Sequence, residues 1–368
     1  MFLSVEQYNK NEKEGKAELS NRFLEAFQPE VFEKLGFPTR VNSNKEVFRY
    51  IDSMHDGRLK YYYNNFDMKP TEEEFQSIKN MSKEIFDYTS ERYKRGIIVK
   101  APLLSSAIIV RKIKALTDYD NVPTIFEIGG GTGILGAMLH KEGYTYISTD
   151  ITQAFYLTQN NLWEGLFPRK VEECFELPLE LKSNDKMYHI PYWKLWELTK
   201  SELEADIIVA NHCLAEMHQR ALEFYLAYGK KLMRNSKYKL LVAQAPGDVA
   251  FGEMSILMKT FEKMGYVLLY SDTNFIVFSL NNKENCKPID YKEWLYQLKY
   301  KTTDFKGMFF NYNNLKDDTA KLVQSNEEKV KNEKKVSLTE INNYFESLSE
   351  NIDSPDEEFI HFLGYEYI

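Results

Sequence analysis

Cysteine is scarce in this chain. Its 368 residues include three cysteines, Cys174, Cys213 and Cys286, which are odd in number and widely spaced. A disulfide framework needs paired thiols, and a cysteine metal knuckle needs closely spaced ones. We therefore expect neither a disulfide nor a metal site, and this cysteine usage is typical of a cytoplasmic protein.

Long apolar runs are also lacking. The opening sequence MFLSVEQYNKNEKEG has a very short apolar stretch before its charged residues. No later run approaches the roughly 18 apolar residues that a membrane span requires. Export and insertion into a membrane are therefore not expected.

Positive charge is not in excess. The formal net charge is −8, and basic groups gather at Lys94-Arg95 and over residues 230–239, which we expect on helix surfaces. Proteins that bind a nucleic-acid backbone usually present a basic face. Nucleic acid is therefore not the expected partner, and the sequence leaves open whether the chain is a monomer or a homodimer.

The length of the chain implies more than one average domain. Its 368 residues, 43% of them hydrophobic, can bury a substantial core. Three regions differ in character. Residues 1–118 are helical, residues 119–281 alternate short strands with helices, and residues 282–368 form a charged, helical or irregular extension.

Helices are expected before and after this strand-rich region in the sequence, over residues 21–36, 71–96, 102–119 and 337–350. Apolar residues recur in them at helical spacing. Two of these helices begin with capping-box pairs, Thr71 with Glu74 and Ser337 with Glu340.

Seven β-rich runs mark the core. The first five alternate with helical segments, which is typical of a parallel sheet, and the last two follow each other directly, as an antiparallel pair does. The predicted fold class is therefore α/β, with a Rossmann-like, mostly parallel sheet. The runs cover residues 124–130, 145–151, 186–193, 205–212, 238–245, 266–272 and 274–280.

The first run ends in the sequence Gly129-Gly130-Gly131-Thr132-Gly133. A cofactor at the carboxyl end of the first strand needs a tight turn and close approach of the backbone. Glycines at 129, 131 and 133 remove side chains that would obstruct it. The helix that begins near Thr132 presents free N–H groups suited to an anionic group.

Two cofactors fit this turn. Gly131, Gly133 and Gly136 satisfy the dinucleotide pattern G-x-G-x-x-G, with Asp150 at about the expected distance. However, a dinucleotide turn that starts directly after the strand would need its third glycine at Ile134. The register fits E-x-G-x-G-x-G better, which favours S-adenosylmethionine.

Two acidic residues accompany the turn. Glu127 lies inside an apolar strand, where a carboxylate is costly without a hydrogen-bond partner or a cation such as the sulfonium. The alternative is exposure at a sheet edge. Asp150 closes the second strand, where it can accept both ribose hydroxyls, and the alternative is an N-cap for the helix near Thr152. Ile151 is assigned to the same cofactor-binding set.

Polar residues follow the fourth strand, where open parallel sheets place catalytic groups. Methyl transfer requires an aligned acceptor and removal of its proton. His212 and His218 are candidate bases, and Asn211 and Glu216 can orient a base or bind the acceptor. Each histidine can equally cap a helix or lie on the surface, and Cys213 is expected to pack. Four residues after the third strand fit either adenine packing or the core: His189, Pro191, Tyr192 and Trp193.

The segment EIGGGTG, the strand-ending Asp150 and the pattern N-x-x-x-x-E-M at Asn211, Glu216 and Met217 resemble the sugar O-methyltransferase family of class I methyltransferases. The resemblance covers residues 124–220. It implies S-adenosylmethionine as cofactor and a hydroxyl of a sugar or similar small molecule as acceptor. It also implies a helical N-terminal region, and we expect these helices to cover the cofactor end of the sheet and to help shape the acceptor pocket.

The chain departs from that family at two places. Thr132 stands where an aromatic residue is frequent, and His212-Cys213 replaces small polar residues. Two other functions stay open. One is an NAD(P)-dependent oxidoreductase, because of the overlapping dinucleotide pattern, and the other is a non-catalytic binding module with the methyltransferase fold.

Overall fold

The fold is described from a computed structural model of the chain. It describes residues 2–29, 39–43, 46–47, 58–65, 68–117, 122–175, 186–214, 217–244, 254–271, 275–280 and 329–349. The division into three regions stays a prediction.

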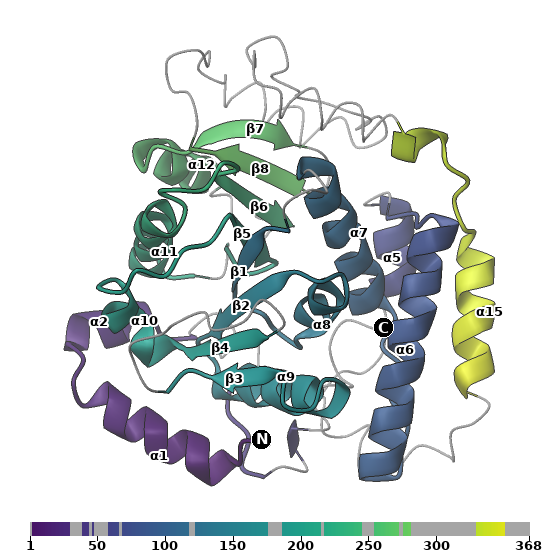
Figure 1. Cartoon of the computed structure of the whole chain (residues 1–368), viewed down its shortest axis with the longest axis horizontal. Coiled ribbons are helices and arrows are strands. Elements are labelled where there is room, and N and C mark those ends of the chain that lie inside the picture. Colours follow the sequence, from purple (N-terminus) through teal and green to yellow (C-terminus); the bar gives the residue numbers. More distant parts are fainter. Residues whose placement is uncertain are drawn as a thin grey trace.

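An eight-stranded sheet with the order β3-β4-β2-β1-β5-β6-β8-β7 forms the centre of the molecule (Figure 1). Strands β1 to β6 pair in parallel, and β8 lies antiparallel to both β6 and β7. This is the predicted α/β sheet of class I methyltransferases, and the prediction is confirmed. The strands are β1 Thr124–Ile128, β2 Thr145–Asp150, β3 Val171–Glu173, β4 Met187–Pro191, β5 Ile207–Asn211, β6 Leu240–Gln244, β7 Val267–Ser271 and β8 Phe275–Ser279.

The strand order reverses at β1. This strand pairs with β2 on one side and with β5 on the other, so crossover connections leave it in opposite directions. A crevice outside the carboxyl ends of the strands at such a switch point is where open α/β sheets bind ligands. The glycine turn directly follows β1.

Helices cover both faces of the sheet. One face packs against α5 Leu59–Asn65, α6 Glu72–Tyr93, α7 Ala101–Leu116 and α8 Ile134–Lys141. The other packs against α11 Gln219–Leu232 and α12 Met254–Lys263. Side chains alternate along β1, so that Ile125 enters the first core and Phe126 the second. Figure 1 shows these helices on opposite sides of the sheet.

The helix α9, Gln153–Leu166, is buried over most of its length. Its polar residues bond to elements far away in the sequence. The Tyr88 hydroxyl of α6 donates to Asn161 Oδ1 at 2.8 Å, and the Leu3 amide donates to Asn160 Oδ1 at 2.8 Å. Because these amides have partners, α9 can lie between α6 and the N-terminal segment.

The first helices pack on the core. Helix α1, Val5–Lys16, contacts α9 and the short helix η2, Tyr192–Lys194, which α10, Leu195–Leu198, follows. Helix α2, Asn21–Ala26, is shorter than predicted: Phe27 is its C-cap, and Pro29 disfavours helical backbone in the residue before it. No helix in the described residues combines the length and apolar content needed to cross a membrane.

The two capping boxes predicted from the sequence are present. Thr71 Oγ1 accepts from the Glu74 amide at 3.3 Å, and the Glu74 carboxylate accepts from the Thr71 amide at 2.7 Å. Ser337 and Glu340 make the same reciprocal contacts at the start of α15, Leu338–Ser349. Helix α15 packs through Ile341 and Phe345 into the core cluster that α6 shares.

Candidate functional site

The turn after β1 has the backbone conformation that its glycines allow. Gly129, Gly131 and Gly133 have φ values of 67°, 55° and 82°, a region that side chains disfavour. The Gly129 amide donates to the Thr149 carbonyl at 2.8 Å, which ties the turn to β2. Gly133 is the N-cap of α8, and no described side chain caps this helix end.

The three glycines differ in what a side chain would meet. A Cβ at Gly129 would lie 3.0 Å from Cys213 Cβ, and one at Gly133 would lie 2.9 Å from Trp163 Nε1. At Gly131 no described atom lies within 4 Å. A Cβ at Gly131 would meet open space, whereas Cβ atoms at Gly129 and Gly133 would meet protein side chains, and the binding of a cofactor by the three glycines stays a prediction.

Asp150 ends β2 beside this turn and has four hydrogen bonds within the chain. Oδ2 accepts from the Gly131 amide and from Gln159 Nε2, both at 3.1 Å. Oδ1 accepts from the amide and hydroxyl of Thr152 at 2.9 and 3.0 Å. The N-cap of α9 is Thr152 and not Asp150. Burial raises the pKa of Asp150, and the hydrogen bonds from Thr152 and Gly131 oppose that shift.

Two residues of α9 hold the turn, and we did not predict this role. Gln159 Nε2 also donates to the Gly131 carbonyl at 2.9 Å, and Trp163 Nε1 donates to the Gly133 carbonyl at 2.7 Å. The amide-rich sequence TQNNLW contains both residues. Because such a composition is unusual for a buried helix, it was the sequence signal from which a role in holding the turn could have been predicted.

Glu127 lies in the central strand and is 1% exposed, so it is not at a sheet edge. Its Oε2 accepts a short hydrogen bond from the Tyr146 hydroxyl, while Oε1 is enclosed and has no partner among the described residues. Burial raises the pKa of Glu127 to about 8; the Tyr146 hydrogen bond opposes this shift, and the charge of Asp150 adds to it. A cation can therefore act on Glu127 through space, but it touches Oε1 only if the surrounding side chains move.

Partly exposed residues from three strand ends border this site. Asn211 is the last residue of β5, His212 and Cys213 follow it, and Cys213 Sγ donates to the Ile128 carbonyl at 3.0 Å. This contact and the packing on Gly129 give Cys213 the packing role that we expected. The partly exposed residues are Gly129, Gly131, Thr132, Ile151, Asn211, His212 and Cys213.

His212 has a left-handed backbone conformation, and its ring packs on helix α5. Its φ is 58°, its amide donates to the Gln244 carbonyl at 3.0 Å, and its ring stacks on Tyr62 of α5 at 5.9 Å. Burial and the nearby Arg58 lower the pKa of His212 to about 4. The imidazole is therefore neutral at physiological pH. The N-terminal region thus supplies a wall beside β5, through α5.

The other predicted groups lie elsewhere. His218 is exposed and is the N-cap of α11, where its Nδ1 accepts from the Arg220 amide at 3.1 Å. His218 therefore takes the helix-capping role that the sequence analysis gave as the alternative to its role as a base. Glu216 lies outside the described residues.

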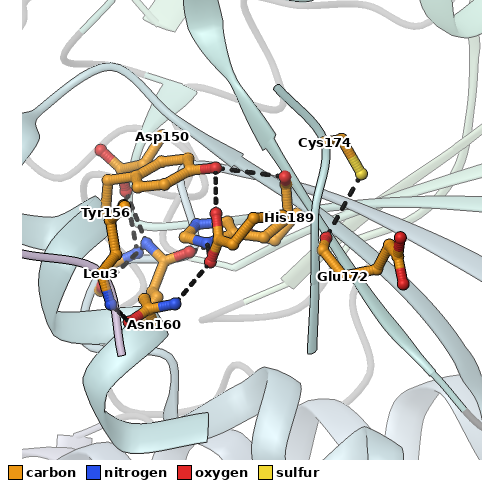
Figure 2. A network of polar contacts seen from close by, with 11 residues as sticks. Leu3, Asp150, Tyr156, Asn160, Glu172, Cys174 and His189 are labelled. Carbon is orange, nitrogen blue, oxygen red and sulfur yellow. Dashed lines mark hydrogen bonds and ion pairs between the residues drawn. The ribbon is translucent and has the colours of Figure 1, made fainter. Parts of the chain in front are cut away.

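The candidate residues in β4 and directly after it are buried in the core, which is one of the two alternatives given above. His189, Tyr192 and Trp193 are 0%, 3% and 2% exposed. His189 Nδ1 lies 3.0 Å from the Glu173 carboxylate, and its ring stacks on Tyr156 at 3.5 Å. Figure 2 shows this network, in which Asn160 bonds both Leu3 and Glu173. The network holds β3, β4 and α9 together.

No family model and no curated protein matches the chain. Among solved structures, it is similar to a TehB-like S-adenosylmethionine-dependent methyltransferase from Corynebacterium glutamicum, at 18% identity over 46% of this chain and 85% of that one, with TM-score 0.33. The ribosomal protein L11 methylase of Lactobacillus delbrueckii subsp. bulgaricus gives 16% identity, 48% and 75% coverage, and TM-score 0.31.

A magnesium protoporphyrin IX methyltransferase from Synechocystis with bound S-adenosylmethionine gives 11% identity over 66% of this chain and 97% of that one, with TM-score 0.32. The strand order and the antiparallel β8 identify the fold as that of class I methyltransferases.

Proposed function

We propose that this protein is an S-adenosylmethionine-dependent methyltransferase acting on a hydroxyl of a sugar or a similar small molecule. One observation carries the proposal: a glycine turn at the switch point of the sheet has open space beside Gly131, and its Gly131 amide is held by Asp150 of the neighbouring strand. The carboxyl ends of the strands at a switch point are where open α/β sheets bind nucleotide-like ligands.

The residues present fit this cofactor. The uncapped start of α8 has N–H groups that can receive its carboxylate. Asp150 can exchange intrachain hydrogen bonds for ribose hydroxyls, and the partly exposed Ile151 can pack beside the nucleoside. A positive charge bound near Glu127 would favour the ionised form of its carboxyl group, which is otherwise mostly protonated at neutral pH. When bound, the cofactor supplies a methyl group that a positively charged sulfur has already activated.

The acceptor would lie beside the end of β5. Asn211 Oδ1 has no hydrogen-bond partner in the described part of the chain, so it can accept a hydrogen bond from the hydroxyl of the methyl acceptor. His212 is neutral and lies next to it, where it can accept the proton that the hydroxyl loses. With a pKa of about 4, His212 is a weak base, so holding the acceptor in line is the larger part of its role. Glu216 remains a predicted acceptor residue.

A nicotinamide cofactor is the second candidate. Gly136 lies in the first turn of α8 and packs on Tyr146 of β2, as the third glycine of a dinucleotide turn packs on its strand. The strand order opposes this candidate, because a dinucleotide-binding sheet continues in parallel where this chain has the antiparallel β8.

Titration of the full-length protein with S-adenosylmethionine and with NADH separates the candidates. We expect saturable binding of the first and none of the second. A screen of sugars with methyl-labelled cofactor then tests the acceptor class. Cofactor binding without transfer to any acceptor would favour a non-catalytic binding module, and binding of NADH alone would overturn the proposal.

A further inference from the structure

Tyr8 of α1 is a buried tyrosine whose hydroxyl makes no hydrogen bond with the described residues. The residue is 0% exposed, and its hydroxyl has no hydrogen-bond partner among the described residues. Its ring packs against Tyr156 at 5.2 Å and meets Trp193 edge-on at 5.0 Å. Buried polar groups are nearly always hydrogen-bonded. This hydroxyl therefore indicates a partner that the described part of the chain does not supply.

Residues beside Tyr8 connect α1 to the segments that follow β2 and β4. Asn9 Oδ1 accepts from Gln153 Nε2 at 2.6 Å, and Gln153 is close in sequence to the end of β2. The Glu12 carboxylate accepts from the Tyr192 hydroxyl at 3.2 Å, directly after β4. Tyr8 therefore lies close to the ends of both strands. The end of β2 is the position proposed for the ribose.

The chemistry of Tyr8 suits a neutral ligand group that accepts hydrogen bonds. Burial and the nearby Glu12 and Tyr192 raise its pKa well above the ordinary value, so the hydroxyl remains a donor. The Glu12 charge is itself paired with Lys16 at 2.9 Å and with Arg40 at 2.5 Å. The oxygens of ribose and the ring nitrogens of adenine are acceptors of the matching kind.

On the basis of the proposed function, we propose that the Tyr8 hydroxyl donates a hydrogen bond to the nucleoside half of S-adenosylmethionine and that α1 forms a wall of the cofactor site. Because protein atoms enclose the hydroxyl, α1 shifts outward to admit the nucleoside. The polar contacts of Asn9 and Glu12 can break and re-form during this shift, and Arg40 is 48% exposed.

Calorimetric titration of the full-length protein with S-adenosylmethionine and S-adenosylhomocysteine tests the proposal on Tyr8→Phe. We expect Kd to rise about tenfold for both ligands, as the loss of one hydrogen bond predicts. The Tm of the free variant should stay equal or rise, because the substitution removes a buried hydroxyl without a partner.

Tyr266→Phe is the matched control. Its hydroxyl donates to the Leu226 carbonyl at 2.8 Å on another part of the molecule, so Tm should fall while Kd stays unchanged. Hydrogen exchange of the amides of α1 should also change when S-adenosylmethionine is added to the wild-type protein.

The outcomes separate the two proposals. Wild-type protein that binds the cofactor, with an unchanged Kd in Tyr8→Phe, would overturn the role of Tyr8 and leave the proposed function standing. Wild-type protein that binds no S-adenosylmethionine would overturn both.

Discussion

The indole nitrogen of Trp163 donates to the Gly133 carbonyl at 2.7 Å, and the same ring occupies the space that a Cβ at Gly133 would enter. A hydrogen bond and a close packing contact thus fix the last glycine of the turn against α9. The turn is held by the protein core as well as shaped by its own backbone. This arrangement should leave the glycine turn formed before any ligand binds.

Gly133→Ala tests this contact. The alanine would combine a φ of 82° with a clash against Trp163, and we expect a loss of about 3 kcal/mol of folding free energy and loss of cofactor affinity. Gly143→Ala is the control, because Gly143 has a φ of 86° and no described atom within 4 Å of its Cβ position. Backbone strain alone should cost about 1 kcal/mol there. Equal losses in urea unfolding would contradict the account.

Glu127 should make stability depend on pH. Burial raises the pKa of Glu127 from its ordinary value of 4.5 to about 8 in the folded protein, so the folded state holds an extra proton between these pH values. The contribution of Glu127 to the free energy of unfolding is therefore fully present below pH 4.5. It is lost as the pH rises through 8, by at most about 1.4 kcal/mol per pH unit. Glu127→Gln should flatten this slope. The check is urea unfolding at pH 5.5 and 8.5, and parallel slopes for both proteins would refute the assignment.

The two histidines after β5 should differ in their effect on turnover. On a sugar that accepts methyl groups in the screen, His212→Gln should lower kcat/KM by about a hundredfold, and His218→Gln should leave it within about twofold. The pKa of His212 is about 4, so the acidic fall of kcat/KM should lie near pH 4. A fall near pH 6.5, or equal effects of both variants, would contradict the role of His212.

Gln159 should support the cofactor without touching it. Gln159→Met removes the donor to Gly131 and Asp150, and we expect about tenfold weaker binding together with about 1–3 kcal/mol lower stability. Gln76→Met is the control, because the amide of Gln76 bonds Asn80 on the exposed surface of α6. Calorimetry and urea unfolding measure both effects. Unchanged binding in Gln159→Met would show that Asp150 needs no such support.

Much of the fold could be predicted because its signals are local. The capping box at Thr71 and the apolar runs of the core strands depend on neighbouring residues, and both are present in the structure. The strand β3 was not predicted, because three residues, Val171–Glu173, give too short a pattern. Helix α1 was also missed, although the Ser4–Gln7 capping box and the buried Val5, Tyr8 and Glu12 spaced along one face were a usable signal.

The candidate site was predictable in its backbone and less so in its contacts. The positions of Glu127 inside β1 and of the glycines directly after it could be predicted, because the apolar run that forms β1 ends at Ile128. The four hydrogen bonds of Asp150 could not be predicted in the same way, because Gln159 comes from another element and the contact depends on how α9 packs. The helix cap at His218 depends on neighbouring residues, but the same residues are equally compatible with a catalytic histidine, so the sequence could not decide between the two roles.

The most direct test of the central claim is isothermal titration with S-adenosylmethionine of the wild-type protein, Asp150→Ala and Asp206→Ala. Asp206 is the matched control, because its carboxylate accepts from the Thr124 amide at 2.9 Å at the opposite end of β1. We predict micromolar binding by the wild type and by Asp206→Ala, and at least tenfold weaker binding by Asp150→Ala. No wild-type binding at high micromolar concentration, or equal affinity in Asp150→Ala, would contradict the claim.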